Sequence, residues 1–254
     1  MCIRDRYLNA YYLMVGYAST AFFSFAFLIL IARMFSVESV GLGVALIAAV
    51  GLLAIISELG LGLTVIRFLQ NARSKGNTLL NTCLTVTGLS SIIVTVVFLI
   101  GIPIWSPAFV SEKHGITFWA VFLAFVIASA FNTIILNAFL AKRKSNFTAV
   151  MSIVTGLFKL LLVYPLAYVF NDVFGILFSA ALATVTTIMI GLFFLLPRVQ
   201  QNYQFKIMID RPVLSRYGVY SIGNYLARLF LQTTPLLLVL IVTNSIGEDM
   251  TAYF

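Results

Sequence analysis

The sequence predicts an all-α polytopic membrane protein with about seven transmembrane helices. Apolar residues make up 61% of the 254 residues and charged residues only 9%, and the mean hydropathy is +1.06. Soluble domains carry about 25% charged residues, so a single soluble core could not bury this much apolar surface and still present a polar exterior. The composition therefore excludes a soluble enzyme, a disordered chain and a nucleic-acid-binding domain, despite the net charge of +8.

Seven apolar stretches are long enough to cross a bilayer. A helix needs about 20 apolar residues to span a hydrocarbon core roughly 30 Å thick. Barrel strands would instead alternate polar and apolar residues, and these stretches do not. In chain order, the predicted spans are Leu8–Ala32, Val40–Leu63, Leu79–Ile102, Ile116–Ala141, Phe147–Phe170, Val173–Leu196 and Tyr217–Val242.

Charged or turn-forming residues separate each span from the next, and no connection is long enough for an extramembrane domain. The longest connector is basic and covers about 20 residues. In order, the separating residues are Arg33 and Glu38; Arg67, Arg73 and Lys75; Trp105 to Pro107; Lys142 to Lys144; Asn171 and Asp172; and Pro197–Arg216.

The basic residues gather on one side of the membrane when alternate loops are assigned to opposite sides. Arg33 and Lys113 lie on the other side, and Lys159 and Arg228 fall inside predicted spans. By the positive-inside rule, the basic side, which includes the N-terminus, is cytoplasmic. It holds twelve of the sixteen basic residues: Arg4, Arg6, Arg67, Arg73, Lys75, Lys142, Arg143, Lys144, Arg198, Lys206, Arg211 and Arg216.

Two motifs resemble those of a known family. Ala32–Gly41 resembles the link "A-R-x-L-G-x-E-x-Y-G" between the first two helices of the oligosaccharide flippases of the polysaccharide-biosynthesis family, with Val40 where that family usually has an aromatic residue. Ser57–Gly62 is similar to the family's "A-E-L-G-L-G" end of the second helix. These flippases belong to a superfamily with MATE-type multidrug exporters and the lipid II flippase.

The resemblance implies two six-helix lobes around one cavity, of which this chain would hold the first lobe and the opening helix of the second. Glu38 and Gly41 recur as Asp249 and Ala252 at an offset of 211, as a parallel repeat predicts. An intact seven-helix, receptor-like protein is the alternative. The expected divisions are a cytoplasmic or non-native start (1–6), a six-helix lobe (7–197), a cytoplasmic linker (198–216) and the first helix of a truncated second lobe (217–254).

Lys159 is the first candidate for substrate binding. It lies near the middle of its predicted span, too deep for its side chain to reach water easily, and ionisable groups at such depth usually face a bundle interior or a wet cavity. Ser152 and Thr155 share its helix face at spacings of three and four. A misplaced span boundary or a structural ion pair is the alternative.

Arg228 is the second candidate. Asn224, Arg228 and Gln232 follow one another at spacings of four, on a polar stripe that also includes Ser221 and Pro235. Because unsatisfied polar groups are costly in hydrocarbon, we expect this stripe to face a cavity, where the arginine fork suits a phosphate. If the span instead begins at Leu229, Arg228 lies among the cytoplasmic headgroups.

The remaining polar residues point to weaker roles. Glu58 is a possible coupling residue for a proton or sodium ion, although helix capping or a local ion pair fits its place near the span boundary better. His114 is the single histidine, so no metal ligand set is expected. Two further stripes favour helix packing over substrate contact: Asn81 with Thr85, and Ser129 with Thr133 and Asn137.

The resemblance implies a flippase for a polyprenyl-diphosphate-linked oligosaccharide in the bacterial inner membrane, serving O-antigen, capsule or exopolysaccharide synthesis by alternating access. Its partners would be this lipid-linked substrate, membrane lipids, and the polymerase and glycosyltransferases of the same pathway. No cofactor, catalytic residue or nucleic acid is expected. The alternatives are a MATE-type cation-coupled exporter, a lipid II flippase, and a membrane polymerase or acyltransferase, which would need a larger outward loop or a His/Asp/Glu cluster.

Overall fold

A computed structural model describes residues 3–72, 75–105, 115–170 and 172–246. Several residues named above lie outside these ranges: Arg73, Lys113, His114, Asn171, Asp249 and Ala252. Within the helices the side chains at 3–6, 104–105, 216–224, 227–228, 232, 235, 242 and 244–246 are also left undescribed.

The described residues form helices joined by short connections, and none of them forms a strand, which confirms the predicted all-α class. The last predicted span of the lobe continues through a π-helical turn, η3 (Gly191–Leu195), into a short helix, α8 (Leu196–Val199). The other helices are α1 (Ile3–Met34), α2 (Val37–Glu58), α3 (Leu61–Phe68), α4 (Gly76–Trp105), α5 (Ile116–Ala141), α6 (Ser145–Val169), α7 (Val173–Ile190) and α9 (Arg211–Ile246).

Six helical segments among the described residues are long and apolar enough to cross a membrane: Tyr7–Met34, Val37–Glu58, Gly76–Pro103, Ile116–Ala141, Ser145–Val169 and Val173–Val199. They correspond to the first six predicted spans, so the chain is a multi-pass membrane protein. The seventh predicted span falls within α9, which is 36 residues long. Its side chains are described only in part, and it is not among the six.

The second span differs from its prediction. An unbroken helix was expected to reach Leu63, but α2 ends at Glu58 because the next two residues, Leu59 (φ 51°) and Gly60 (φ 72°), are left-handed. The chain turns there, and α3 begins at Leu61. The carboxylate of Glu58 accepts a hydrogen bond from the backbone N–H of Gly62 at 3.1 Å, which satisfies one of the free donors at the start of α3.

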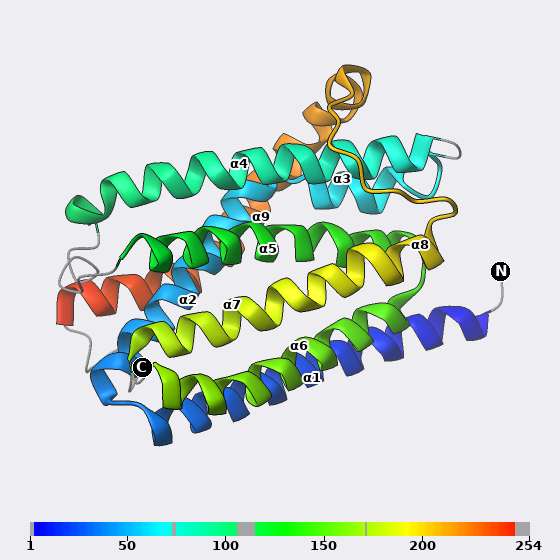
Figure 1. The fold of residues 1–254 in the computed structure, drawn as a ribbon. Coiled ribbons are helices and arrows are strands. Elements are labelled where there is room, and N and C mark those ends of the chain that lie inside the picture. The colour runs from blue at the N-terminus through cyan, green and yellow to red at the C-terminus, as the bar shows by residue number, and fades with distance from the viewer. Residues whose placement is uncertain (1–2, 73–74, 106–114, 171, 247–254) are drawn as a thin grey trace.

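The helices are arranged mainly in one layer, with further helices behind it (Figure 1). Within the layer, α6 packs on α7, α7 on α5, and α5 on α4, while α1 lies along α6 at the edge. α2 passes behind and contacts α4, α5 and α7, and α9 packs on α2 and α3. A core of buried apolar side chains between α4, α5 and α7 includes Leu80, Ile134 and Ile188.

The predicted linker is a docked segment. Residues 202–210, which we call the strap, leave α8 and run in extended form along the N-terminal part of α4 (Figure 1). α9 then begins at Arg211, six residues before the predicted span. The Asp210 carboxylate accepts a hydrogen bond from Val213 N at 3.0 Å, the geometry of a helix N-cap.

Side chains of α4 bind the strap backbone, which corrects the expectation that Asn81 and Thr85 pack helix against helix. Asn77 and Asn81 donate to the carbonyls of Asn202 (2.9 Å) and Gln204 (2.8 Å). Two hydroxyl oxygens of α4 accept from strap N–H groups: Thr85 from Met208 at 3.1 Å, and Thr82 from Asp210 at 3.2 Å. An extended segment has no internal hydrogen bonds of its own, so these side chains supply partners that it would otherwise lack.

Candidate functional site

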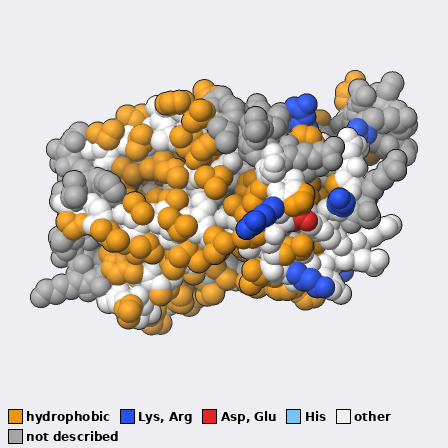
Figure 2. All heavy atoms as spheres, turned by 90° about the horizontal axis from the view of Figure 1, so that it is seen from above, with side chains coloured by type: hydrophobic (Ala, Val, Ile, Leu, Met, Phe, Trp, Pro, Cys, Tyr) orange, Lys and Arg blue, Asp and Glu red, His pale blue; other side chains and the backbone are white. Residues whose placement is uncertain are grey.

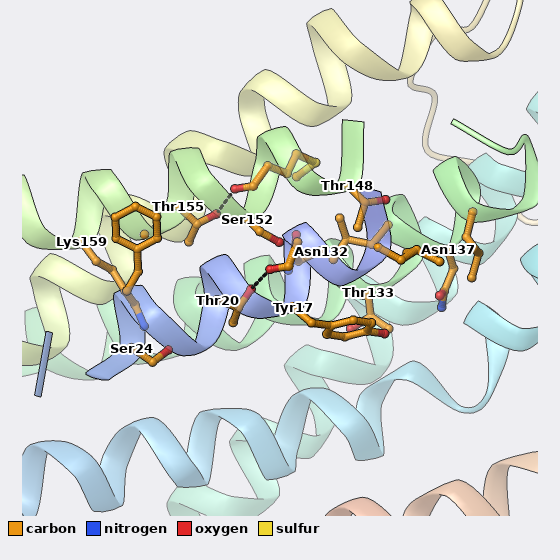
Figure 3. A pocket seen from close by; sticks show the side chains of 17 residues that line it. Tyr17, Thr20, Ser24, Asn132, Thr133, Asn137, Thr148, Ser152, Thr155 and Lys159 are labelled. Carbon is orange, nitrogen blue, oxygen red and sulfur yellow. Dashed lines mark hydrogen bonds between the residues drawn. The ribbon is translucent and has the colours of Figure 1, made fainter. Parts of the chain in front are cut away.

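A pocket of about 380 Å³ opens between α1, α5 and α6 (Figure 3). Its volume is within the range of about 300–1,000 Å³ typical of small-ligand sites. α1 packs closely along α6, and α5 contacts α6 less extensively, so α6 is the wall in contact with both of the others. Polar side chains come into the pocket from all three helices.

The wall from α6 contains the predicted residues. Ser152, Thr155 and Lys159 all line the pocket, together with Thr148 one turn earlier. Their spacings of four, three and four place them on one face of the helix, as the sequence suggested. The structure thus brings these three candidates together, while their role in binding stays a prediction.

Lys159 is the only charged side chain among the described residues that line the pocket. It extends from α6 toward Ser24 of α1 (Figure 3). Its Nζ lies 5.2 Å from the centroid of the Phe27 ring, within the range of a cation–π contact. A ring face offsets part of the cost of desolvating an ammonium group, and Lys159 is the only basic side chain among the described residues of the lining.

The wall from α1 was missed by sequence reasoning. Tyr17, Thr20 and Ser24 line the pocket opposite α5 and α6. Their spacings of three and four form a polar stripe in an otherwise apolar helix, and this signal was present in the sequence. Small hydroxyl residues are common in membrane helices, however, so such a stripe in the sequence does not by itself show which helix or cavity it faces.

The wall from α5 contributes Asn132, Thr133 and Asn137. The stripe of Thr133 and Asn137 was expected to pack helix against helix, whereas these residues line the pocket; Asn132 was not singled out. The Nδ2 atom of Asn137 is buried and has no hydrogen-bond partner among the described residues. It lies against Gly62 of α3, so the far end of this wall reaches the break between α2 and α3.

At two positions around the pocket, neighbouring atoms lie so close that only a glycine fits. A Cβ at Gly156 would clash with Phe23, at the line where α1 and α6 meet. A Cβ at Gly62 would clash with both Glu58 Oε1 and Asn137 Nδ2. The motif Ser57–Gly62 therefore has a physical basis: Glu58 caps α3, Gly60 is left-handed, and Gly62 leaves room for the capping carboxylate.

Glu58 is 2% exposed, and its hydrogen bond to Gly62 N is the capping interaction that the sequence favoured over ion coupling. Tyr225 of α9 lies nearby and donates to Ile56 O at 3.0 Å. A coupling role for Glu58 stays a prediction. Among the described residues, no group of three or more His, Cys, Asp or Glu side chains could hold a metal ion.

The second set of candidates cannot be placed against the pocket. The side chains of Asn224, Arg228 and Gln232 lie outside the described residues, although their backbone belongs to α9. α9 packs on α2 and α3, and none of its described residues lines the pocket. That Arg228 and Lys159 share one cavity stays a prediction.

Comparisons with known proteins bear on this architecture. A family model described as polysaccharide biosynthesis protein matches residues 8–245. Among curated proteins, no sequence matches this chain.

Three solved structures have the same fold. One is a MOP superfamily transporter from Pyrococcus furiosus, for which a reverse polarity of the binding pocket suggests a different function. It is 19% identical in sequence to this chain, and the two superpose with a TM-score of 0.59. The match covers 95% of this chain and 61% of that one. Structures of MATE in complex with MaD5 and with MaD3S are each 16% identical, with TM-scores of 0.59 and 0.58, over 95% of this chain and 62% of theirs. The chain thus spans less than two thirds of each.

Proposed function

Because the chain belongs to the polysaccharide biosynthesis protein family, we propose that it is part of a flippase for a polyprenyl-diphosphate-linked oligosaccharide. It would act in the bacterial inner membrane, in the synthesis of O-antigen, capsule or exopolysaccharide. The chain is a multi-pass membrane protein with the fold of MOP superfamily transporters. Family and fold indicate a transporter rather than an enzyme.

Lys159 is the observation that carries the proposal. Among the described residues that line the pocket, Lys159 is the only basic side chain, and the others are neutral polar or apolar. A charge in such surroundings attracts an oppositely charged ligand more strongly than it would in water. The diphosphate of a lipid-linked sugar supplies that charge, while the polyprenyl tail stays in the bilayer.

Alternating access fits this arrangement. The substrate site of such transporters lies near the middle of the membrane, between two halves that rock against each other, and Lys159 is near the middle of α6. In the whole transporter, we propose that Arg228 and its neighbours on α9 contribute a second cationic group from the other half. The polymerase and glycosyltransferases of the same pathway are the proposed partners.

The charge distribution supports a cytoplasmic N-terminus. Figure 2 shows the Lys and Arg side chains of one face gathered at the end of the molecule that carries α8 and the strap, with hydrophobic side chains over the rest of that face. Exposed basic residues at this end include Arg143, Arg198 and Lys206. Because translocated loops are poor in Lys and Arg, this end is proposed to face the cytoplasm.

A MATE-type exporter of cationic drugs and a lipid II flippase are the alternatives. The three similar structures share the fold alone with this chain at 16–19% identity. The charge of the pocket discriminates between the two classes of substrate, because Lys159 would repel a cationic drug and attract either lipid-linked diphosphate. The proposal is therefore an anionic, lipid-linked substrate.

The test uses the full-length transporter in a strain that lacks its own flippase. Lys159→Ala should reduce surface polysaccharide per unit of membrane protein, whereas Lys159→Arg should retain more of it because the charge remains. Lys144→Ala, an exposed residue outside the pocket, is the control. An isolated charge costs about 2.5–3.5 kcal/mol in mid-membrane, so Lys159→Ala should not impair insertion. Full polymer with Lys159→Ala at equal expression would contradict the proposal.

A further inference from the structure

The strap is bound to α4 along one edge only. The strap residues whose backbone bonds to α4 side chains are all even-numbered: Asn202, Gln204, Met208 and Asp210. In an extended chain the backbone N–H and C=O groups of successive residues point to opposite sides, so those of Phe205, Ile207 and Ile209 point away from α4. Within the described residues, none of these three N–H groups has a hydrogen-bond partner.

The strap lies at the surface of the membrane. The candidate span of α4, Gly76–Pro103, has 28 residues. That is about 42 Å of helix, enough to cross the hydrocarbon core and both headgroup layers of a bilayer about 40–45 Å thick. The strap is bonded to this span from Asn77 to Thr85, about 12 Å along the helix. With α4 upright in the bilayer, the strap therefore reaches from the headgroup layer into the outermost hydrocarbon.

The side chains of the strap change in character with this depth. Gln204 is near the headgroup end, and the exposed Lys206 follows it. Ile207 and Ile209 come last, on either side of Met208, whose N–H bonds to α4 at the deeper end. These isoleucines are 82% and 51% exposed. Apolar side chains at this level are stabilised by entering the boundary between headgroups and acyl chains.

The surroundings of the strap are basic. Arg198 before the strap and Arg211 after it are exposed, as is Lys206 within it. The one acidic side chain of the strap, Asp210, accepts the N–H of Val213 at the start of α9. In Figure 2 the basic side chains gather at the end of the molecule that carries the strap. Basic side chains at the level of the headgroups attract anionic lipids.

We propose that the strap binds an anionic phospholipid. Lys206 and the outward N–H groups of Phe205 and Ile207 donate to the lipid phosphate, and the side chains of Ile207 and Ile209 insert beside its acyl chains. The phosphate accepts from N–H groups that would otherwise stay unpaired next to hydrocarbon. A peptide strand along the same edge would also pair these groups, but it would not account for the basic surroundings. The inference does not depend on the substrate proposed for the pocket.

The test measures hydrogen–deuterium exchange of the strap amides by mass spectrometry. The purified chain is placed in nanodiscs of phosphatidylcholine, or of equal parts of phosphatidylcholine and phosphatidylglycerol. Both discs supply acyl chains, and only the second supplies headgroups with a net negative charge. Each variant is compared with itself in the two discs, so that changes in its intrinsic exchange rate cancel.

The wild-type strap should exchange more slowly in the anionic discs. Lys206→Ala should reduce this difference about fivefold, the effect of one basic side chain beside an anionic surface, and Lys206→Arg should keep it. Ile207→Ser should speed exchange in both discs, because it removes contact with acyl chains and no charge. Lys144→Ala is the matched control: it removes an exposed positive charge outside the strap and should leave the difference unchanged.

Three outcomes would overturn the inference. Equal exchange of the wild-type strap in the two discs would show that anionic lipid is not bound there, and protection that persists in detergent would show that protein covers the edge. Equal effects of Lys144→Ala and Lys206→Ala would reduce the result to general surface charge. Slower exchange on adding inorganic phosphate to the phosphatidylcholine discs would assign the site to a soluble anion. Lys159 takes no part in any of these measurements, so the inference and the proposed function fail separately.

Discussion

Tyr203 of the strap donates a hydrogen bond of 2.8 Å to the Oδ1 atom of Asn81 on α4, although the two residues are 122 positions apart in the chain. The Nδ2 atom of the same amide donates to the next carbonyl of the strap, that of Gln204. Both Asn81 and Tyr203 are buried, at 2% and 5% exposed. One amide therefore holds both a side chain and the backbone of the segment that leads into α9.

Asn81→Ala should release the strap. It leaves the buried Tyr203 hydroxyl without its partner, at a cost of about 1–3 kcal/mol, and it also removes the donor of the more exposed Gln204 carbonyl. Trypsin should then cut the purified protein faster after Lys206, which lies in the strap, than it cuts the wild type. Cleavage after Lys144, between α5 and α6, is the internal reference.

Thr95→Val is the control for this experiment. Thr95 is buried on the same helix, and within the described part of the chain its hydroxyl has no hydrogen-bond partner, so its loss should leave cleavage at Lys206 unchanged. If Asn81→Ala and Thr95→Val are cut at the same rate as wild type, the strap does not depend on this amide.

Strap docking should weaken at high pH. Burial raises the pKa of Tyr203 above its ordinary value, which is about 10. Because the pKa is higher in the folded state than in the unfolded state, the hydroxyl stabilises the docked strap fully below about pH 10 and loses that contribution as the pH rises further. The unfolding temperature of the wild type should fall as the pH is raised above about 10, and Tyr203→Phe should lack the part of this fall that the Tyr203 hydroxyl causes.

Gly156→Ala should separate α1 from α6 and disturb the pocket. The new methyl group would meet Phe23 at its Cβ and ring base, which cannot swing away freely, and overpacking of this kind costs about 1–3 kcal/mol. The unfolding temperature should fall. Gly16→Ala is the control on the same interface, since its Cβ would lie 3.5 Å from the nearest atom, Ala149 Cα, an ordinary contact. Equal effects of the two variants would show that the interface is not this tight.

Glu58→Gln and Glu58→Ala separate capping from charge. Glutamine keeps an acceptor for Gly62 N, so the break between α2 and α3 should hold and stability should stay close to wild type. Alanine removes the cap and should cost about 0.5–2 kcal/mol. A transport defect in Glu58→Gln without loss of stability would support the coupling role; normal transport with Gln together with a stability loss with Ala would assign Glu58 to the fold alone.

The proposed orientation is tested by labelling single cysteines, with Cys2 and Cys83 replaced, in whole cells. Cysteines at Arg143 and Lys206 should be protected from membrane-impermeant thiol reagents because those sites would face the cytoplasm. One at Lys113, which lies outside the described residues, should react. Permeabilised cells should label at Arg143 and Lys206, which controls for burial of the thiol; labelling at Arg143 in intact cells would reverse the topology.

The sequence by itself determined the features that depend on a single helix. Apolar length alone located the first six spans, because crossing a bilayer imposes about 20 apolar residues whatever the neighbours are. The shared face of Ser152, Thr155 and Lys159 followed in the same way, since helical periodicity is a property of α6 alone. The motif at Ser57–Gly62 was recognised as resembling the end of a second helix, but the span was predicted to run on to Leu63, past the left-handed turn at Leu59 and Gly60.

The tertiary structure decided which polar faces meet. Asn81 and Thr133 belong to similar short stripes, and nothing within either helix shows that one binds the strap and the other lines the pocket. The wall formed by Tyr17, Thr20 and Ser24 became part of a site because α1 lies along α6. A polar stripe must be satisfied somewhere in an apolar medium, but Asn81 meets a segment 122 residues away and the α1 wall meets a helix more than 100 residues away, so only the packing of the whole bundle selects these neighbours.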